Sequence, residues 1–334
     1  MRRFSTAGLI WALAIVLPAV SLLSMTVGTV SISVGDLFAA DNNQTQTILF
    51  DIRLPRILLA ICVGAVLSST GAVMQGLFRN PLADPSLIGV SSGASVGASL
   101  MIVAAGGFIH SGALLGLSLV AVGAFVGGFV ATLVVYRLAT SGIGTSVTTM
   151  LLAGIAIAAI AGALNSLLSY FSDNDMLRQI SLWQMGNLSG ASWTKVTIMA
   201  FVALLLMSLF PRDSRALNAL LLGESEARHL GVDVQAVKRR LIILTALGVG
   251  VCVALAGLVG FVGLIIPHIV RLAIGPDHRW LIPASALAGA TLLVIADSLA
   301  RIVVVPAELP TGILTALLGA PFFFALLLQQ RKQV

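Results

Sequence analysis

Charged residues are almost absent from the long apolar runs of this sequence, and Asp297 is the clearest exception. Arg301 follows one helical turn later, so the two side chains can form an ion pair along one helix. An intramembrane acid with access to a pathway would indicate proton-coupled transport. The neighbouring arginine instead favours a paired structural charge, so Asp297 gives only feeble support to an ion-coupled secondary transporter.

His268 is a second candidate, because it follows Pro267 and lies close to Arg271. No second histidine or cysteine lies at ligand spacing from it, so a hydrogen-bonded histidine at a helix start is favoured over a metal ligand. The sequence contains no H-E-x-x-H or G-x-S-x-G motif, which argues against an intramembrane hydrolase. We therefore expect neither a metal site nor a catalytic set.

A nucleotide site is also missing from the sequence. The lysines are Lys195, Lys238 and Lys332, and none of them follows a glycine. There is consequently no G-x-x-x-x-G-K-[ST] loop to hold the phosphates of ATP. If ATP drives this protein, a separate subunit must bind the nucleotide and its Mg²⁺, and this chain is not itself an enzyme.

The longest polar passage, residues 212–240, is flanked by apolar runs. Short helices are predicted at 216–222 and 224–230, with Gly223 as the break between them and Gly231 as a C-cap. Glu224 and Arg228 stand four residues apart, in the favourable orientation for an ion pair. A solvated loop is the alternative, but two compact helices favour a docking surface for a soluble partner.

The composition is that of a polytopic membrane protein. The mean hydropathy is +1.05 and only 10% of the 334 residues are charged. At about 20 residues per crossing, the chain has room for roughly ten transmembrane helices, so we predict an all-α fold. The net charge of +6 comes from Lys and Arg at span ends, which indicates topology and not nucleic-acid binding. Cys62 and Cys252 lie in apolar runs and are predicted to be free thiols.

A single transmembrane domain is predicted for residues 1–334, with the insert 212–240 between spans 6 and 7. Gly257, Gly260, Gly263 and Pro267 interrupt the run 241–275, which we therefore divide into span 7 and a short span 8. Polar loops are expected at 29–53 and 171–192. The remaining spans are predicted after Arg56 to residue 77, from the second polar loop to residue 210, and at 7–28, 87–105, 113–136, 148–170, 281–304 and 312–328.

The distribution of basic residues tests this count. With the N-terminus inside, fourteen of the nineteen Lys and Arg residues fall on the inner side, which favours two cytoplasmic termini. Nine spans would place Arg331 and Lys332 outside, so ten spans are preferred. Glycines four residues apart, at Gly93 and Gly97 and at Gly123 and Gly127, predict close packing between helix backbones.

Several short motifs follow one another from about residue 50 to the C-terminus. They are R-L-P-R at 53–56, G-A-V-M-Q-G at 71–76, R-N-P-L-A-D-P at 79–85, E-A-R-H-L-G-V at 226–232, G-F-V-G-L-I-I-P-H at 260–268, Asp297, Arg301, E-L-P at 308–310 and G-A-P-F at 319–322. In this order and spacing they resemble the FecCD/BtuC-type permeases, the membrane subunits of ABC importers for iron chelates, haem and cobalamin. Taken whole, the chain looks most like the haemin-importer permeases.

The resemblance implies a BtuC-like type II importer fold with ten helices in each subunit. It implies a homodimer in the bacterial inner membrane, assembled with two ATP-binding cassette subunits and one periplasmic substrate-binding protein. Haem is the expected cargo, with a ferric siderophore or cobalamin as the alternative. No permanently bound cofactor is expected, and ATP and Mg²⁺ belong to the partner subunit.

The resemblance also implies roles for individual residues. Arg53, Arg56 and Arg301 match outward arginines that receive acidic residues of the binding protein. A cytoplasmic gate is implied at the start of span 5, where Val147 replaces a hydroxyl residue of a relative; its residues are Ser146, Val147, Thr148 and Thr149. The segment implied to contact the ATPase comprises Leu222, Gly223, Glu224, Ala227, Arg228, His229, Leu230 and Gly231.

Overall fold

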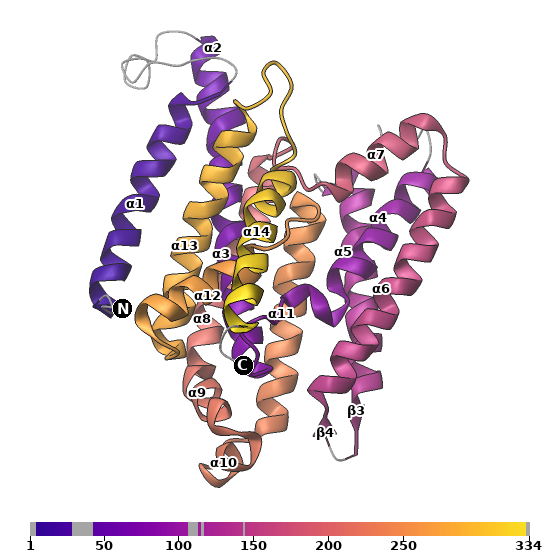
Figure 1. The fold of residues 1–334 in the computed structure, drawn as a ribbon. Helices are drawn as coiled ribbons and strands as arrows, with labels where there is room; N and C mark the ends of the chain where they lie inside the picture. The colour runs from indigo at the N-terminus through magenta and orange to yellow at the C-terminus, as the bar shows by residue number, and fades with distance from the viewer. Residues whose placement is uncertain (1–4, 29–42, 106–112, 115–116, 143, 332–334) are drawn as a thin grey trace.

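The computed structural model describes residues 5–28, 43–105, 113–114, 117–142 and 144–331, and the chain is helical almost throughout (Figure 1). The expected all-α fold is therefore confirmed. The helices are α1 (Thr6–Thr26), α2 (Asn43–Gln46), α3 (Leu54–Leu77), α4 (Val90–Ala105), α5 (Leu119–Ala139), α6 (Val147–Tyr170), α7 (Asn174–Gln184), α8 (Trp193–Leu209), α9 (Ser214–Leu222), α10 (Glu224–His229), α11 (Val234–Ala256), α12 (Val262–Ile274), α13 (His278–Ala300) and α14 (Thr311–Arg331).

Short elements join these helices. A π-helix, Thr47–Arg53, connects α2 to α3, and 3-10 turns lie at Pro85–Ile88 and Phe210–Asp213. Two antiparallel hairpins complete the described elements. They are β1 (Ala113–Leu114) with β2 (Leu117–Ser118), and β3 (Thr140–Ser141) with β4 (Gly144–Thr145).

Seven helical segments of the described chain are long and apolar enough to cross a membrane, and three shorter apolar helices accompany them. The division of residues 241–275 is confirmed, because α11 ends at Ala256 and α12 begins at Val262. Four predicted segments differ in the structure. The predicted span 113–136 begins later, because residues 113–114 and 117–118 form the hairpin β1–β2 and α5 begins at Leu119. Helix α11 begins at Val234, so the end of the predicted insert belongs to a span; residues 43–53 are helical and continue into α3; and the second polar loop contains α7.

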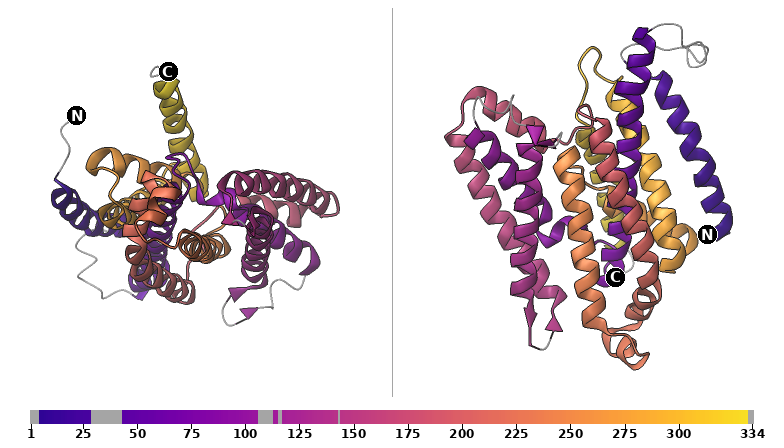
Figure 2. Two further views of the ribbon diagram at one scale, coloured as in Figure 1. Left: turned by 90° about the horizontal axis from the view of Figure 1, so that it is seen from below. Right: turned by 180° about the vertical axis from the view of Figure 1, so that it is seen from behind.

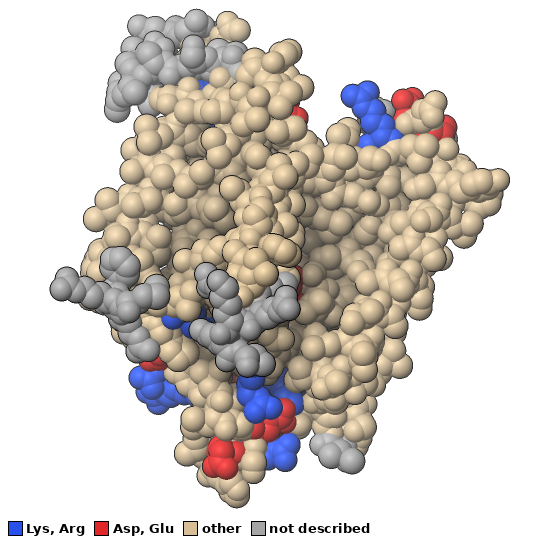
Figure 3. Space-filling view, in the orientation of Figure 1, with Lys and Arg blue, Asp and Glu red and all other residues tan. Residues whose placement is uncertain are grey.

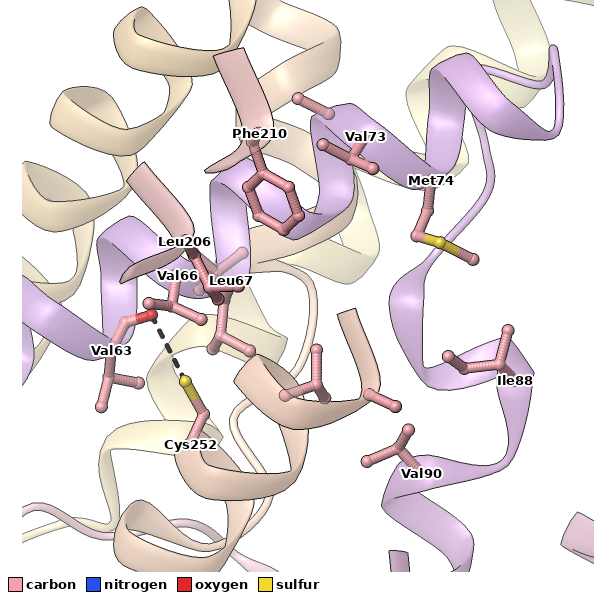
Figure 4. Close-up of a cluster of buried hydrophobic side chains, with 14 of the residues drawn as sticks. Val63, Val66, Leu67, Val73, Met74, Ile88, Val90, Leu206, Phe210 and Cys252 are labelled. Atoms are coloured by element: carbon pink, nitrogen blue, oxygen red, sulfur yellow. Dashed lines mark hydrogen bonds between the residues drawn. The ribbon is translucent and has the colours of Figure 1, made fainter. Parts of the chain in front are cut away.

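Helix α3 is the centre of the packing. Nineteen of its 24 residues are buried, and it contacts α8, α11, α12 and α13. In Figures 1 and 2, α4, α5, α6 and α7 form one group beside α11, while α1, α3, α8, α12, α13 and α14 lie on its other side. The buried cluster between α3, α8 and α11 includes Phe210, Leu206 and Cys252, whose Sγ lies 4.0 Å from the carbonyl oxygen of Val63 (Figure 4). Both cysteines are free thiols, as predicted.

Small residues allow the helix backbones to approach closely. A Cβ at Gly97 of α4 would lie 2.7 Å from the carbonyl carbon of Gly123 in α5, and one at Gly127 would lie 3.1 Å from the carbonyl carbon of Gly93. The predicted close packing of these glycine pairs is confirmed. Contacts of this kind replace the hydrophobic drive that lipid does not provide.

The molecule has two polar ends and an apolar middle. Helices α9 and α10 and the hairpin β3–β4 lie at the lower end in Figure 1, and α2 and α7 lie at the upper end. The first turn of α1 and the last turn of α14 point toward the lower end. Figure 3 shows charged side chains gathered mainly around α9 and α10, below a broad band without charge. These two ends are where the candidate site residues lie.

Candidate functional site

At the upper end, Asp297 of α13 lies between two arginines. Its carboxylate accepts hydrogen bonds from Nε of Arg56, at 2.9 Å to each oxygen, and forms an ion pair with Nε of Arg301 at 3.3 Å. Arg56 Nη1 also pairs with Oε2 of Glu308 at 2.6 Å, and the Thr311 hydroxyl donates to Asp297 at 3.1 Å. This network joins α3, α13 and the start of α14.

The same network extends to α1. Arg301 donates from Nη1 to the Val27 carbonyl at 3.1 Å and from Nη2 to the Ser24 hydroxyl. Arg53 donates to the carbonyl oxygen of Met25. The end of the peripheral helix α1 is therefore held by two arginines from elements distant in the sequence.

The three arginines predicted to receive the binding protein do lie together. Arg53, Arg56 and Arg301 line a cavity of about 130 Å³ with Glu308. Each is at least 95% buried in the single chain, and Arg56 and Arg301 face Asp297. The predicted Asp297–Arg301 pair is confirmed, whereas the partners Arg56 and Glu308 were not foreseen. Docking of a partner by these arginines stays a prediction.

At the lower end, α10 and the residues that flank it present a mixed surface to solvent. Leu222 and Leu230 are 69% and 64% exposed, and Arg228 and His229 are also exposed, while Ala227 is fully buried against the body. Two large exposed leucines on a compact polar element are typical of a protein-protein contact. The helices α9 and α10 confirm the two predicted short helices, with Gly223 between them at a φ of +126°.

Gly231 ends α10 in the left-handed conformation, with a φ of +82°. Its N–H donates to the Arg228 carbonyl at 2.9 Å, and the N–H of Val232 donates to the Ala227 carbonyl at 3.0 Å. This is the hydrogen-bond pattern of a Schellman C-cap, which strongly favours glycine. The predicted C-cap is confirmed.

Glu224 has a stronger partner than the one predicted. Its pair with Arg228 is present at 3.8 Å, but Oε1 of Glu224 lies 2.6 Å from Nζ of Lys238, a side chain that is only 2% exposed. Lys238 also donates to the carbonyl oxygen of Thr145 at 2.8 Å. A buried lysine on α11 thus holds α10 and strand β4 together.

Asn218 fixes α9 against the turn between α12 and α13. Its amide donates to Asp277 at 2.6 Å and accepts from the backbone N–H of His278 at 2.9 Å. Burial opposes ionisation of Asp277, but the hydrogen bonds from Asn218 and from the backbone N–H of Arg279 outweigh it and lower its pKa. Asp213, just before α9, forms an ion pair with Arg240 of α11. Helix α9 is therefore anchored at two points.

The predicted gate residues begin α6. The Ser146 side chain caps the helix by accepting from the N–H of Thr149 at 3.3 Å, and the Thr149 hydroxyl lies 3.0 Å from it. Val147 is the first helical residue, and Thr148 is exposed. The hairpin β3–β4 immediately before them was not predicted. The gating role of these residues stays a prediction.

His268 differs from expectation. It lies inside α12 and not at a helix start, its ring contacts Phe322 edge-on, and its Nδ1 has no hydrogen-bond partner among the described residues. Within the described ranges, no group of three or more His, Cys, Asp or Glu side chains is placed to hold a metal ion.

Comparison with known proteins shows that one family model covers nearly the whole chain, including both polar ends. Residues 15–329 match the sequence profile of the FecCD transport family. The hemin transport system permease protein HmuU of Yersinia pestis is 46% identical over 96% of this chain and 95% of its own length. The vitamin B12 import system permease protein BtuC of Shigella boydii is 44% identical, over 93% of this chain and 92% of its own length. A solved metal-chelate type ABC transporter in an inward-facing conformation superposes with a TM-score of 0.86 and 35% identity, covering 97% of this chain and 99% of the other.

The match spans nearly the whole chain and includes the motifs at both polar ends. Permeases of ABC transporters have no ATP site of their own, and a separate subunit hydrolyses the nucleotide. The apolar helices and this relationship place the chain in the inner membrane as a multi-pass protein. The chain is a member of the FecCD transport family, a permease subunit of an ABC importer.

Proposed function

We propose that this chain carries haem from a periplasmic binding protein into the cytoplasm, as a homodimer with two ATPase subunits. The observation that carries this proposal is the 46% identity to a hemin permease over 96% of the chain. Cobalamin is the second candidate, because a vitamin B12 permease is 44% identical over 93% of the chain. Both termini are proposed to be cytoplasmic, in line with the basic residues that favour this side.

The interior of the chain suits a path that releases its cargo. A cavity of about 340 Å³ lies between α3, α4, α11 and the turn that leads to α12. Leu67, Val249, Val253 and Phe261 line it, and among the described residues Asp84 is the acidic one in its lining. Tight binding then belongs to the binding protein, and the permease alternates which side of the path is open.

The lower end offers the surface that the ATPase subunit needs. Leu222 and Leu230 provide apolar contact area, and Arg228 and His229 provide polar groups around it. At the upper end, Arg53, Arg56 and Arg301 line one small cavity, which we propose as the contact for acidic groups of the binding protein. Because these side chains are at least 95% buried in the single chain, the contact requires a rearrangement that exposes them. A glutamate at position 56 would face Asp297, so a charge reversal there would disturb folding as well as docking.

The proposal is tested by uptake into proteoliposomes that hold the chain, its ATPase and its binding protein. We expect ATP-dependent accumulation of haem to be at least about tenfold faster than that of a ferric siderophore or cobalamin. A tenfold ratio corresponds to about 1.4 kcal/mol of discrimination between the cargoes. The isolated chain should hydrolyse no ATP. Faster uptake of cobalamin would make cobalamin the cargo and leave the chain an ABC importer permease. Uptake driven by an ion gradient without ATP would overturn the assignment to ABC importers.

Gly231 provides a separate test of the lower end. Gly231→Val should strain the left-handed C-cap by roughly 1–2 kcal/mol and tilt α10. The position is open, since a Cβ there meets nothing within 4 Å, so the strain is local and the buried spans should still assemble. We expect normal abundance in the membrane, weaker co-purification of the ATPase and strongly reduced uptake.

The matched variant is Gly231→Asn, because asparagine tolerates the left-handed conformation, and it should retain most of the uptake. Unchanged uptake by Gly231→Val would show that transport does not depend on the orientation of α10. Loss of the Gly231→Val protein itself would show that this glycine serves the fold.

A further inference from the structure

Lys238 occupies a position that the proposed function does not yet use. It belongs to the first turns of α11. This end of α11 lies at the lower end of the molecule, between α10 and the hairpin β3–β4 (Figures 1 and 2). Its Nζ contacts Glu224 on one side, at 2.6 Å, and the carbonyl oxygen of Thr145 on the other, at 2.8 Å. One ammonium group therefore bonds to the segment predicted to contact the ATPase and to the residue before the predicted gate.

Gln235 strengthens the second of these connections. It precedes Lys238 by about one helical turn, and its Oε1 accepts from the backbone N–H of Thr145 at 2.9 Å. The N–H and the carbonyl of Thr145 are thus both held by α11. Gly144 makes this approach feasible: its φ is +129°, and a Cβ there would lie 2.7 Å from the Gln235 amide carbon.

The connection continues directly into α6. Thr145 is followed by Ser146, whose side chain caps α6 through Thr149. The hairpin is narrow, with the Thr140 and Thr145 hydroxyls 3.0 Å apart. A displacement of Thr145 therefore moves the cap of α6, because no flexible segment lies between them.

Burial gives the connection its stiffness. The Lys238 side chain is 2% exposed, while that of Glu224 is 31% exposed. Separation would leave the ammonium group buried without its carboxylate, at a cost in desolvation, so the two side chains are expected to move together. By contrast, the Glu224–Arg228 pair is 3.8 Å long with Arg228 58% exposed, and such surface pairs contribute little. The Glu224–Lys238 contact, and not the longer pair with Arg228 on α10 itself, ties α10 to the rest of the chain.

We propose that Lys238 and Gln235 are positioning residues that transmit the movement of α10 to the start of α6. A shift of α10 against the ATPase pulls Glu224, Lys238 follows, and the bonds to Thr145 move the Ser146 cap. The inference rests on the proposed function, because it takes α10 as the ATPase contact and residues 146–149 as the gate.

The test uses the complete importer in proteoliposomes, with a Thr148→Cys reporter in a background of Cys62→Ala and Cys252→Ala that retains uptake. The labelling rate of this cysteine by a membrane-impermeant maleimide is measured with and without ATP. Allosteric coupling typically amounts to about 5- to 150-fold, so we expect ATP to change the labelling rate at least about fivefold in the reporter protein. In Lys238→Met this change should fall below about twofold, and uptake should fall at least about tenfold, while ATP hydrolysis by the assembled complex stays within about twofold.

Three further variants separate transmission from stability. Gln235→Leu removes only the hydrogen bond to Thr145 and should give the same uncoupling. Lys238→Met with Glu224→Met removes both members of the pair and leaves no unpaired charge there, so the chain should keep normal abundance but should not regain uptake. Arg239→Met, at the exposed neighbouring position, should match the unsubstituted complex.

The outcomes are distinct. Uptake and reporter response that survive in both Lys238→Met and Gln235→Leu would overturn the proposal, as would recovery of uptake in the double methionine variant. If the reporter without these substitutions ignores ATP while haem is still taken up, the gate assignment fails and the inference fails with it. If no complex forms or no cargo is transported by the unsubstituted chain, the proposed function itself is wrong.

Discussion

Asp297→Leu is expected to destabilise the folded chain by about 3–5 kcal/mol, because it leaves two arginines buried without their shared carboxylate. Arg56 and Arg301 are 4% and 3% exposed, and both bond to this side chain. Glu308 still faces Arg56 but is itself one-third exposed, so it compensates only in part. The loss should appear as a lower unfolding temperature in detergent and as reduced abundance in the membrane.

A compensated variant distinguishes this cause from simple loss of packing. Asp297→Leu combined with Arg56→Met and Arg301→Met removes these three buried charges and leaves Glu308, which is one-third exposed. Apolar replacement of buried ion pairs is often neutral or stabilising. The triple variant should therefore recover much of the stability. As a control for exposed pairs, Arg228→Ala should cost no more than about 0.5 kcal/mol. An Asp297→Leu protein as stable as the unsubstituted chain would show that the network does not hold α3 and α13 together.

The sequence predicted local features well because they depend on local spacing. The predicted span 148–170 differs by one residue from α6, since the change in hydropathy at each end is sharp. The pairs Asp297–Arg301 and Glu224–Arg228 follow from a spacing of four residues on a helix, and both are present. The C-cap at Gly231 follows from the place of a glycine after a short helix.

The ion-pair partners that are distant in the sequence could not be predicted, because the prediction relied on local spacing. Arg56 lies 241 residues from Asp297, and no local pattern in a single sequence connects them. Lys238 lies 14 residues from Glu224, across a turn whose geometry brings the two side chains together. In each case the shorter contact is the non-local one, made by a buried arginine or lysine, while the predicted local pair is longer.

Two helical segments in the predicted polar loops were missed, and the sequence held a capping signal for only one of them. Helix α7 is polar and begins at Asn174. Its N-cap is Asp173, whose carboxylate accepts from the Met176 N–H at 2.8 Å. Hydropathy does not detect such a helix, whereas capping patterns do. The π-helix Thr47–Arg53 carries Asp51 and Arg53 among apolar residues, and these charges suggested a loop. It continues without a break into α3, so no capping residue marks its end.

Gly71→Ala is expected to cost about 3 kcal/mol, at the upper end of the range for overpacked cores, because the added methyl group meets backbone and not a flexible side chain. A Cβ at Gly71 of α3 would contact the carbonyl oxygen of Gly263 in α12 and lie 2.6 Å from its carbonyl carbon. The approach is mutual, since a Cβ at Gly263 would lie 2.8 Å from the Leu67 carbonyl oxygen. The amide of Gln75 holds the two helices at this distance by donating to the Leu264 carbonyl at 2.9 Å.

The helices α3 and α12 therefore cannot separate to accept the methyl group without breaking this bond, and α3 is the centre of the packing. We expect Gly71→Ala to lower the unfolding temperature and the abundance of the chain sharply, with any remaining protein inactive. The control is Gly8→Ala in the exposed first turn of α1, where a Cβ meets only Ser5 at 3.6 Å. There the substitution should be neutral or stabilise by up to about 1 kcal/mol, because alanine is the better helix former. Equal stability of the two variants would mean that α12 is free to move away from α3, and that the close contact of Gly71 with Gly263 is not needed to hold the fold.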